Sequence, residues 1–356
     1  MGRFAVASGT RVQKFWQKFA TLNYGGNPAA DLPKDNYTTG LRIVSGQTVT
    51  SGSAIPVIAG YGAWGPIGTV NLKGPGNRAP IALGADYLDF YMRVRKAPYA
   101  SVATTDVVTA STTTTWNTPL EVPLTVTPMS TLGCLFTGDT TQTFTLRLNN
   151  DAAAQVFSTV NGATIQGSWD VYRETFEAPE PTAPGGWLND ISFYHELSYQ
   201  NTTALKNGST KIELPINTDY MRIFLFFYTG SRQDNTYAAA DGLYTSIDVM
   251  VNNKIHVVET IFERKFKDEM AQRYGWASAP PVGVAVIDFM TQGESRRDVF
   301  PTDPPDCTDF ALTIVSTSSS NNVDVITETV SDSPFATKFV AAAAAAQQAT
   351  TTAAAA

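Results

Sequence analysis

The side chains best suited to chemistry are two histidines and a scatter of carboxylates. His195 stands in the run FYHELSY and His256 in NKIHVVE. Neither histidine opens an HExxH motif and no third ligand lies nearby, so the sequence does not favour a metal site. Each histidine alternates with apolar neighbours on an expected strand. That pattern favours packing or surface placement over catalysis.

Pairs of carboxylates are the more serious catalytic candidates, because glycosidases need only two, one acting as acid and the other as base or nucleophile. Asp86 with Asp89, or Glu259 with Glu263, are such pairs. Acidic β-proteins always offer pairs of this kind, as turn caps, cross-strand partners or solvated charges. No G-x-S-x-G elbow and no phosphate-binding loop occurs. We therefore expect no enzyme, no catalytic residue, no cofactor and no metal.

The composition limits the classes of protein to which this chain can belong. The 356 residues are 43% hydrophobic and 16% charged, with a formal net charge of −7. An acidic chain lacks the basic stripe of a nucleic-acid-binding protein, so sequence-specific nucleic-acid binding is not expected. We expect both cysteines, Cys134 and Cys307, to be buried thiols unless the fold brings them together. No signal peptide and no apolar stretch of membrane-spanning length is visible, which predicts synthesis in the cytoplasm.

The first thirty residues contain a basic, aromatic segment, RVQKFWQKFATL. Its apolar residues recur at helical spacing, which predicts a short amphipathic helix. Such a helix either docks on its own domain or a neighbouring subunit, or lies against a membrane. If it contacts a membrane, deleting residues 1–24 should leave soluble assemblies that attach poorly to vesicles. The candidate contact residues are Arg11, Lys14, Phe15, Trp16, Lys18 and Phe19.

The rest of the chain has the pattern of short strands separated by Gly, Pro, Asn and Thr. The segment EAPEPTAPGG, with three prolines and two glycines, is the best linker candidate. The final AAAAAAQQATTTAAAA is of low complexity, and we expect it to be mobile or to lie along a neighbour. The predicted parts are an N-terminal arm (1–30), a first β domain (31–178), a linker (179–186), a second β domain (187–332) and a tail (333–356).

The two β domains resemble each other in the order of their motifs. ADYLDFYMRV in the first half matches TDYMRIFLFFY in the second, and both are expected to be strands. FTLRLNN and WDVYRETF in the first half match FALTIVST and VDVITETV in the second. Roughly eight antiparallel strands per half is the content of a jelly roll, two Greek keys in a two-sheet sandwich. The fold class predicted is therefore all-β, with two tandem eight-stranded jelly rolls.

One segment, ETIFERKFKDEMAQRYG (259–275), interrupts the β pattern. Phe262, Phe266, Met270 and Tyr274 are four residues apart, and Gly275 follows as a stop signal. We expect a helix that crosses between strands of the second jelly roll. The first half shows no equally clear helix.

The last third of the chain resembles the double jelly-roll major capsid proteins of the tectivirus and adenovirus lineage. The motif residues that carry this resemblance are Gly283, Asp288, Phe289, Arg297, Asp298, Thr308, Asp309 and Leu312. The resemblance implies a homotrimeric, pseudo-hexagonal capsomer that tiles an icosahedral capsid over an internal membrane, in the virion of a bacteriophage. It also implies that the chain's partners are copies of itself, penton proteins and minor capsid proteins.

The residues alone leave two questions undecided, the role of one charged loop and an alternative function. Arg296 and Arg297 in ESRRD either pair with carboxylates of a neighbouring subunit or belong to a solvated loop. The alternative function is that of a secreted carbohydrate-active enzyme or glycan-binding protein built from two jelly rolls. That class would be favoured by a signal peptide, disulfides and clustered tryptophans. The six tryptophans of this chain are scattered along it.

Overall fold

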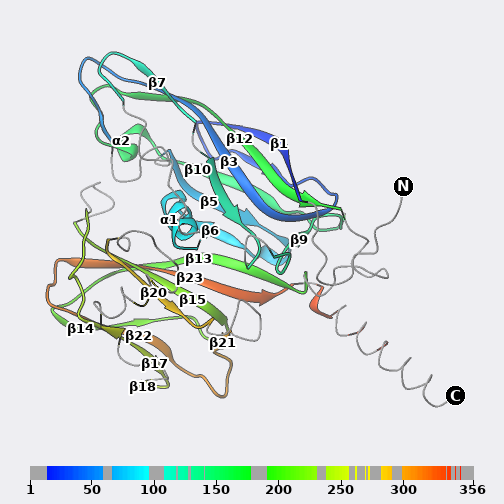
Figure 1. Ribbon diagram of the computed structural model, residues 1–356, viewed down its shortest axis with the longest axis vertical. Coiled ribbons are helices and arrows are strands. Elements are labelled where there is room, and N and C mark those ends of the chain that lie inside the picture. Colours follow the sequence, from blue (N-terminus) through cyan, green and yellow to red (C-terminus); the bar gives the residue numbers. More distant parts are fainter. Residues whose placement is uncertain are drawn as a thin grey trace.

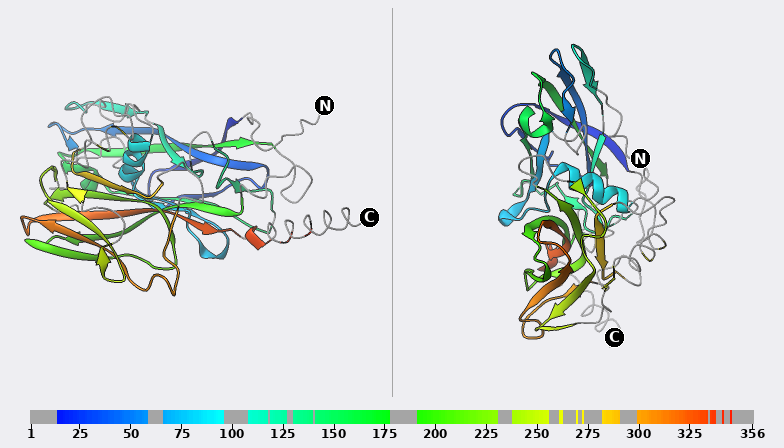
Figure 2. Two further views of the ribbon diagram at one scale, coloured as in Figure 1. Left: turned by 60° about the horizontal axis from the view of Figure 1, so that its bottom comes forward. Right: turned by 90° about the vertical axis from the view of Figure 1, so that its left-hand side faces the viewer.

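The computed structural model shows a nearly all-β protein whose sheets are stacked in layers (Figure 1). The strands of both halves lie roughly along one common axis (Figure 2). None of the helices in the described part of the chain is long and apolar enough to cross a membrane. The structure describes residues 14–58, 66–95, 108–117, 119–126, 130–139, 141–177, 191–230, 238–255, 261–262, 269, 272, 282–290, 299–333, 335–337, 341 and 345.

The outer sheet of the first half, which we call the β1 sheet, has the order β1-β12-β3. Three short strands pair in succession along the far side of β3. All of these pairings are antiparallel. The strands are β1 (Phe15–Asn23), β12 (Thr164–Phe176), β3 (Tyr37–Thr50), β7 (Thr113–Trp116), β8 (Pro119–Pro123) and β9 (Leu135–Phe136).

A second sheet, which we call the shared sheet, continues from the first half into the second. The junction is a short parallel pairing in which Leu197 lies opposite Ile81 and Ser198 opposite Ala82. From the first half come β2 (Ala29–Asp31), β10 (Thr145–Asn150), β5 (Ile67–Lys73) and β6 (Ile81–Leu83). From the second half come β13 (Phe193–Ala204), β23 (Asn321–Asp332) and β15 (Asp219–Thr229), with β16 (Ala238–Ala239), β20 (Val284–Asp288) and β21 (Phe300–Pro301) along β15.

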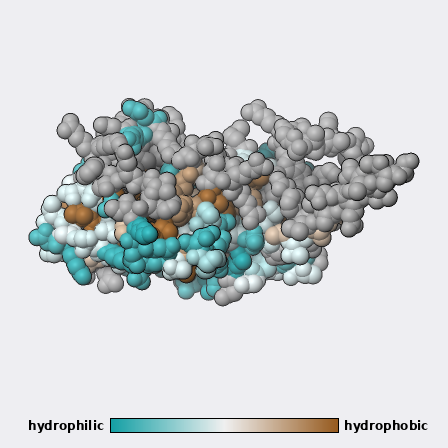
Figure 3. Space-filling view, turned by 90° about the horizontal axis from the view of Figure 1, so that it is seen from below, coloured by the Kyte–Doolittle hydropathy of each residue, from teal (hydrophilic) through white to brown (hydrophobic). Residues whose placement is uncertain are grey.

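The outer sheet of the second half, which we call the β14 sheet, has the order β14-β22-β17, with β18 and β19 along β17. Seen from the side of this sheet, the described surface is mainly hydrophilic, with small separate hydrophobic areas (Figure 3). Its strands are β14 (Gly208–Glu213), β22 (Phe310–Ser316), β17 (Ser246–Val251), β18 (Lys254–Ile255) and β19 (Ile261–Phe262). The remaining elements are β4 (Val57–Ile58) paired with β11 (Phe157–Thr159), a 3-10 turn at Pro75–Asn77, α1 (Ala85–Arg95) and α2 (Ala153–Val156).

The strand order of the first half is repeated in the second. In each half the first strand pairs with the last, the last with the third, and the third with a later strand. Thus β1, β12, β3 and β8 correspond to β13, β23, β15 and β20, and β2, β10, β5 and β6 correspond to β14, β22, β17 and β19. Each half therefore has eight strand positions in two four-position sheets, which confirms the predicted pair of jelly rolls.

Two of the three motif matches between the halves are confirmed, and one is wrong. FTLRLNN and FALTIVST fall on the corresponding strands β10 and β22, and WDVYRETF and VDVITETV fall on β12 and β23. ADYLDFYMRV forms the helix α1, whereas TDYMRIFLFFY forms β15. The reason is visible in the burial: Tyr87, Leu88, Tyr91 and Met92 are buried, a spacing that lies on one face of a helix.

The predicted N-terminal amphipathic helix is wrong, because Phe15–Asn23 forms the strand β1. This strand pairs with β12 along its length. The backbone hydrogen bonds and ion pairs of that ladder outweigh a helical spacing in so short a segment, since isolated short helices are marginal in water. Leu22 is the one residue of β1 that is fully buried.

The predicted helix at 259–275 lies largely outside the described residues. Its first turn is wrong, because Ile261 and Phe262 form β19 against β17. Glu269 and Gln272 are helical. In chain order, α1 stands between β6 and β8, as this segment stands between β19 and β20. The first half therefore does carry a helix at the corresponding place, contrary to expectation.

The main hydrophobic core is one cluster that includes strands of both halves, such as Leu41 and Val70 from the first and Leu225 and Leu312 from the second. Cys134 and Cys307 are both buried free thiols, as predicted.

The structure allows a comparison for only one of two predicted segments, the linker (179–186) and the tail (333–356). The linker 179–186 lies outside the described residues, so the domain boundaries stay a prediction. The predicted tail begins inside the protein, because Phe335 is buried with its ring 5.8 Å from that of Phe136.

Candidate functional site

A buried polar network joins α1 of the first half to the shared sheet in the second half. Phe90 and Tyr91 pack edge-on against Phe226 and Phe224 of β15, with ring centroids 4.4 and 5.3 Å apart. Tyr87 and Tyr91 are one helical turn apart, so their hydroxyls lie on the same face. Both reach carboxylates of β23, 237 residues away in the sequence. The network thus crosses the boundary between the two jelly rolls.

Glu328 is the centre of this network. Its side chain is fully buried, and it accepts hydrogen bonds from Tyr91 Oη at 2.8 Å and from Arg222 Nη1 at 3.0 Å. His195 Nε2 lies 2.9 Å from the same carboxylate. Arg222 in turn lies 3.0 Å from Asp288 of β20. These contacts hold the buried Glu328 carboxylate in one orientation.

Asp324, two strand repeats before Glu328 on the same face of β23, forms a second centre. It is fully buried and accepts hydrogen bonds from Tyr87, from Thr202 at 2.5 Å and from Tyr228 at 3.0 Å. Burial, and then the charge of Asp324, raise the pKa of the Tyr228 hydroxyl well above its ordinary value. Tyr228 therefore stays a neutral donor at all physiological pH values.

This geometry indicates a structural function. Among the described residues, the Asp324 and Glu328 carboxylates are buried and each accepts several hydrogen bonds from protein side chains. The described residues contain no group of three or more side chains that could hold a metal ion. The network ties one jelly roll to the other, because its hydrogen bonds join tyrosines of α1 to carboxylates of β23 in a buried site.

The sequence favoured packing or surface placement for His195, and the structure buries it in this network. The sequence reasoning missed the carboxylates themselves. A signal was available, because the two halves share the pattern Asp-Val-x-x-Glu, at Asp170–Glu174 and Asp324–Glu328.

Several predicted residues are not brought together as a site. Asp86 lies in the first turn of α1 and Asp89 is buried in the same helix. Glu259, Glu263 and His256 lie outside the described residues, as do Arg11, Arg296 and Arg297. The described members of the N-terminal set all lie on or next to β1.

Those N-terminal residues form contacts along the β1 sheet. Lys14 Nζ lies 3.4 Å from Glu174, and Lys18 Nζ lies 2.7 Å from Asp170. The Arg42 guanidinium lies 4.2 Å from the centre of the Trp16 ring, a cation–π contact. A half-open hollow of about 250 Å³ lies beside them, lined by Trp16, Thr39, Gly40, Leu41, Arg42, Met92, Glu121, Val122, Pro123, Thr125 and Glu174.

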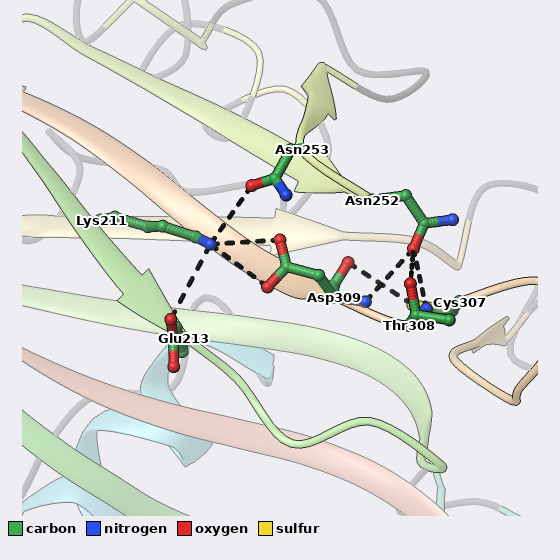
Figure 4. Close-up of polar contacts among 7 residues, drawn as sticks. All are labelled: Lys211, Glu213, Asn252, Asn253, Cys307, Thr308 and Asp309. Atoms are coloured by element: carbon green, nitrogen blue, oxygen red, sulfur yellow. Dashed lines mark hydrogen bonds and ion pairs between the residues drawn. The ribbon is translucent and has the colours of Figure 1, made fainter.

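The Thr308-Asp309 motif has a structural explanation in the hairpin between β17 and β18 (Figure 4). Asn252 and Asn253 both have positive φ, which a tight two-residue turn requires. The Asn252 side-chain oxygen accepts hydrogen bonds from Thr308 N at 2.8 Å, Thr308 Oγ1 at 2.9 Å and Asp309 N at 3.2 Å. Lys211 of β14 lies 3.1 Å from Asp309. The motif thus ties three strands of the β14 sheet together at one end.

Replacing Asn252 by alanine should destabilise the fold by about 2–3 kcal/mol, because it removes these hydrogen bonds and because alanine adopts a positive φ less readily than asparagine. Chemical unfolding measures the loss. Asn253→Gly is the matched control, since glycine accepts the same φ and only a 3.4 Å contact to Lys211 is lost. Equal losses in the two variants would contradict this role of the Asn252 side chain.

Asp151 provides a pH test within the first half. Burial, and then the charge of Asp86, raise the pKa of the Asp151 carboxyl above its ordinary value. A raised folded pKa means that stability is full below the ordinary pKa and falls as pH rises through the folded pKa. Asp151→Asn should therefore raise the melting temperature at pH 7, with the gain fading as pH falls through the raised pKa of Asp151 and gone below about 4, the ordinary pKa of an aspartate.

Asp170 is the control of opposite sign. Hydrogen bonds from Lys18 and then Thr21 lower the pKa of the Asp170 carboxyl. Asp170→Asn should therefore lower the melting temperature slightly at pH 7. A stabilising effect of Asp170→Asn, or none from Asp151→Asn, would argue against this electrostatic assignment.

Comparison with known proteins agrees with this architecture. No family model and no curated protein sequence matches the chain. Among solved structures, the STIV MCP (Sulfolobus Turreted Icosahedral Virus) superposes with a TM-score of 0.69 at 15% identity, over 92% of this chain and 98% of that one. The chain has the double jelly-roll fold of viral major capsid proteins.

Two other structures with this fold are similar over most of their length. The major capsid protein of bacteriophage PM2 gives a TM-score of 0.54 at 14% identity, over 88% of this double jelly-roll chain and 98% of the PM2 protein. The PBCV-1 virus capsid gives 0.57 at 11% identity, over 92% and 96%. The fold is thus shared although little sequence is.

Proposed function

We propose that this double jelly-roll protein is a viral major capsid protein whose function is self-assembly. Its proposed unit is a homotrimeric capsomer of pseudo-hexagonal outline, and many such capsomers tile an icosahedral shell. The observation that carries the proposal is the repeat of eight strand positions in the two halves. Three copies then supply six similar jelly rolls, which approximate a hexagon.

The buried network supports this proposal. A shell unit transmits contacts from one jelly roll to the next, so the two must be held as one body. The Tyr87–Asp324 and Tyr91–Glu328 hydrogen bonds and the shared sheet do this within the chain. The resemblance to capsid proteins covers both halves, which supports a role for the whole chain.

Finer parts of the proposal rest on the resemblance alone. They are a bacteriophage virion as the location, synthesis in the host cytoplasm, penton and minor capsid proteins as partners, and an internal membrane beneath the shell. With β1 built into a sheet, a membrane-bound N-terminal helix at Phe15–Asn23 is no longer part of it.

The proposal is tested by the size and shape of the purified protein. Light scattering should give three times the 38.4 kDa mass of the chain, and negative-stain microscopy should show particles of pseudo-hexagonal outline. A stable monomer that binds or cleaves glycans would overturn the proposal in favour of the carbohydrate-active alternative.

A further inference from the structure

The inner face of β3 is not apolar along its whole length. It begins with Leu41 and Ile43, which belong to the main core, and continues through Ser45 and Gln47 to Val49. Val49 belongs to a separate, smaller hydrophobic cluster at the end of the first jelly roll that carries β7 and α2 (Figure 1). Polar side chains therefore lie between two apolar clusters in the interior of this jelly roll.

Four side chains form this polar layer, which we define as Ser45, Gln47, Trp116 and Asn150. Gln47 lies directly opposite Trp116 of β7, so the two side chains share a face. Ser45 stands two residues before Gln47 on that same face. Asn150 comes from the other sheet, at the end of β10, where it lies opposite the buried Ile67. The polar layer thus has members in both sheets of the first jelly roll.

The polar atoms of this layer are buried and have no protein partner among the described residues. They are the Ser45 hydroxyl, both amide atoms of Gln47, the indole Nε1 of Trp116 and both amide atoms of Asn150. Ser45, Gln47 and Trp116 are at most 1% exposed. A buried amide or hydroxyl without a hydrogen bond costs free energy, and most such groups in folded proteins are bonded.

Tyr24 shows that the two sheets come close together at this layer. Its backbone N donates to Gly167 O at 2.9 Å, and its hydroxyl donates to Asp151 O at 2.6 Å. Gly167 of β12 lies opposite Gln47, and Asp151 follows Asn150 in the chain. One tyrosine therefore spans the distance from the strand beside Gln47 to the residue after Asn150, which places the two amides at one level of the interior.

The second jelly roll has a counterpart of this place. Leu205 N donates to Asn321 O at 2.9 Å, as Tyr24 N donates to Gly167 O in the first. Asn321 and Gly167 also stand at the same distance before the repeated Asp-Val-x-x-Glu pattern. Asn321 in β23 therefore corresponds to Gly167 in β12.

The side chain of Asn321 bridges the two sheets of the second jelly roll. Its amide donates to Ser316 Oγ at 3.0 Å and to the carbonyl oxygen of Leu243 at 3.0 Å. Ser316 is the last residue of β22, as Asn150 is the last residue of β10. In the second half, a carboxamide of the chain itself thus satisfies the residue that corresponds to Asn150.

The first jelly roll cannot bridge its sheets in the same way. Gly167 has a φ of +115°, and a Cβ at this position would lie 2.6 Å from Gly46 O. The backbone therefore excludes a side chain where the second half has Asn321. The donors and acceptors of the polar layer fit an uncharged group that can both donate and accept, and that is about the size of one carboxamide.

We propose that the polar layer of the first jelly roll is a binding site for ordered water, which joins Gln47 to Asn150 across the two sheets. Water fits because each molecule both donates and accepts, and because buried sites with several polar partners hold it firmly. A charged ligand does not fit, since none of the four side chains carries a charge that would compensate it. The site lies inside one chain, so it goes beyond the proposed self-assembly and does not depend on it.

A high-resolution structure of the full chain tests the site directly. Ordered density of the size of water is expected between Gln47 and Asn150, within about 2.7–3.2 Å of their amide atoms. The proposal is overturned if these amides bond to protein atoms instead, or if no density lies between them.

The substitution Gln47→Met measures what the bound water contributes. Methionine resembles glutamine in shape but has only a weakly accepting sulfur. If water bonds the Gln47 amide, the variant loses those hydrogen bonds, and its melting temperature should fall by about 2–4 °C. If the amide is buried without any partner, its removal should leave the melting temperature unchanged or raise it, and the site would be disproved.

Gln166→Met is the matched control, because Gln166 is an exposed glutamine on the neighbouring strand β12. Its melting temperature should stay close to that of the unaltered chain. A fall as large as that of Gln47→Met would show that the exchange itself, and not the polar layer, sets the effect. Should Gln47→Met fail to fold, the density between Gln47 and Asn150 in the unaltered chain still decides.

Discussion

Replacing Glu328 by alanine is expected to destabilise the unassembled chain by about 3–5 kcal/mol, the usual cost of removing one partner from a buried ion pair. The Arg222 guanidinium would lose one of its two carboxylate partners and keep Asp288, and the Tyr91 hydroxyl would lose the Glu328 acceptor, in a buried site. The loss should appear as a lower denaturant midpoint, and it should weaken the hold of α1 on the second half. Tryptophan fluorescence during guanidinium unfolding measures it.

Glu174→Ala is the matched control because Glu174 stands at the corresponding place in the first half. It contacts Lys14 at 3.4 Å and Thr39 at 2.6 Å, but its side chain is partly exposed. In the unassembled chain we expect a loss of about 1 kcal/mol or less. Both variants are measured at concentrations below association. Losses of similar size would show that burial under α1 does not set the importance of Glu328.

Most of the strands could be predicted from the sequence, because alternation of β-branched and aromatic residues between turn residues reflects local geometry. The predictions failed where two periodicities fit the same residues. Phe15–Asn23 has helical spacing but forms a strand, since β12 offers it a complete ladder. Ala85–Arg95 was expected to be a strand but forms a helix, since its buried tyrosines are one turn apart. In both cases tertiary contacts decide whether the segment forms a helix or a strand.

The site could be predicted only in part. The repeated Asp-Val-x-x-Glu pattern marks the carboxylates, and the position of each in its half is visible in the sequence. Their donors are not visible, because Tyr87 and Tyr91 come from 237 residues away and from the other jelly roll. The pairing of β1 with β12 and of β13 with β23 likewise depends on strand register, which a single sequence does not give.

Deleting residues 1–24 is expected to destabilise the chain strongly, by at least about 4 kcal/mol, from lost apolar burial and lost ladder hydrogen bonds. The deletion removes the whole of β1, including the buried Leu22, and uncovers the edge of β12. Exposed strand edges favour aggregation, so the product should be largely insoluble. This outcome reverses the expectation of soluble assemblies that followed from an N-terminal helix.

A shorter deletion, of residues 1–13, separates the strand from the segment before it. It keeps β1 together with its contacts from Lys14 to Glu174 and from Lys18 to Asp170. Soluble yield and melting temperature should therefore stay close to those of the full chain. If deletion of 1–24 instead gave a soluble protein with an unchanged melting temperature, β1 would contribute little to the fold.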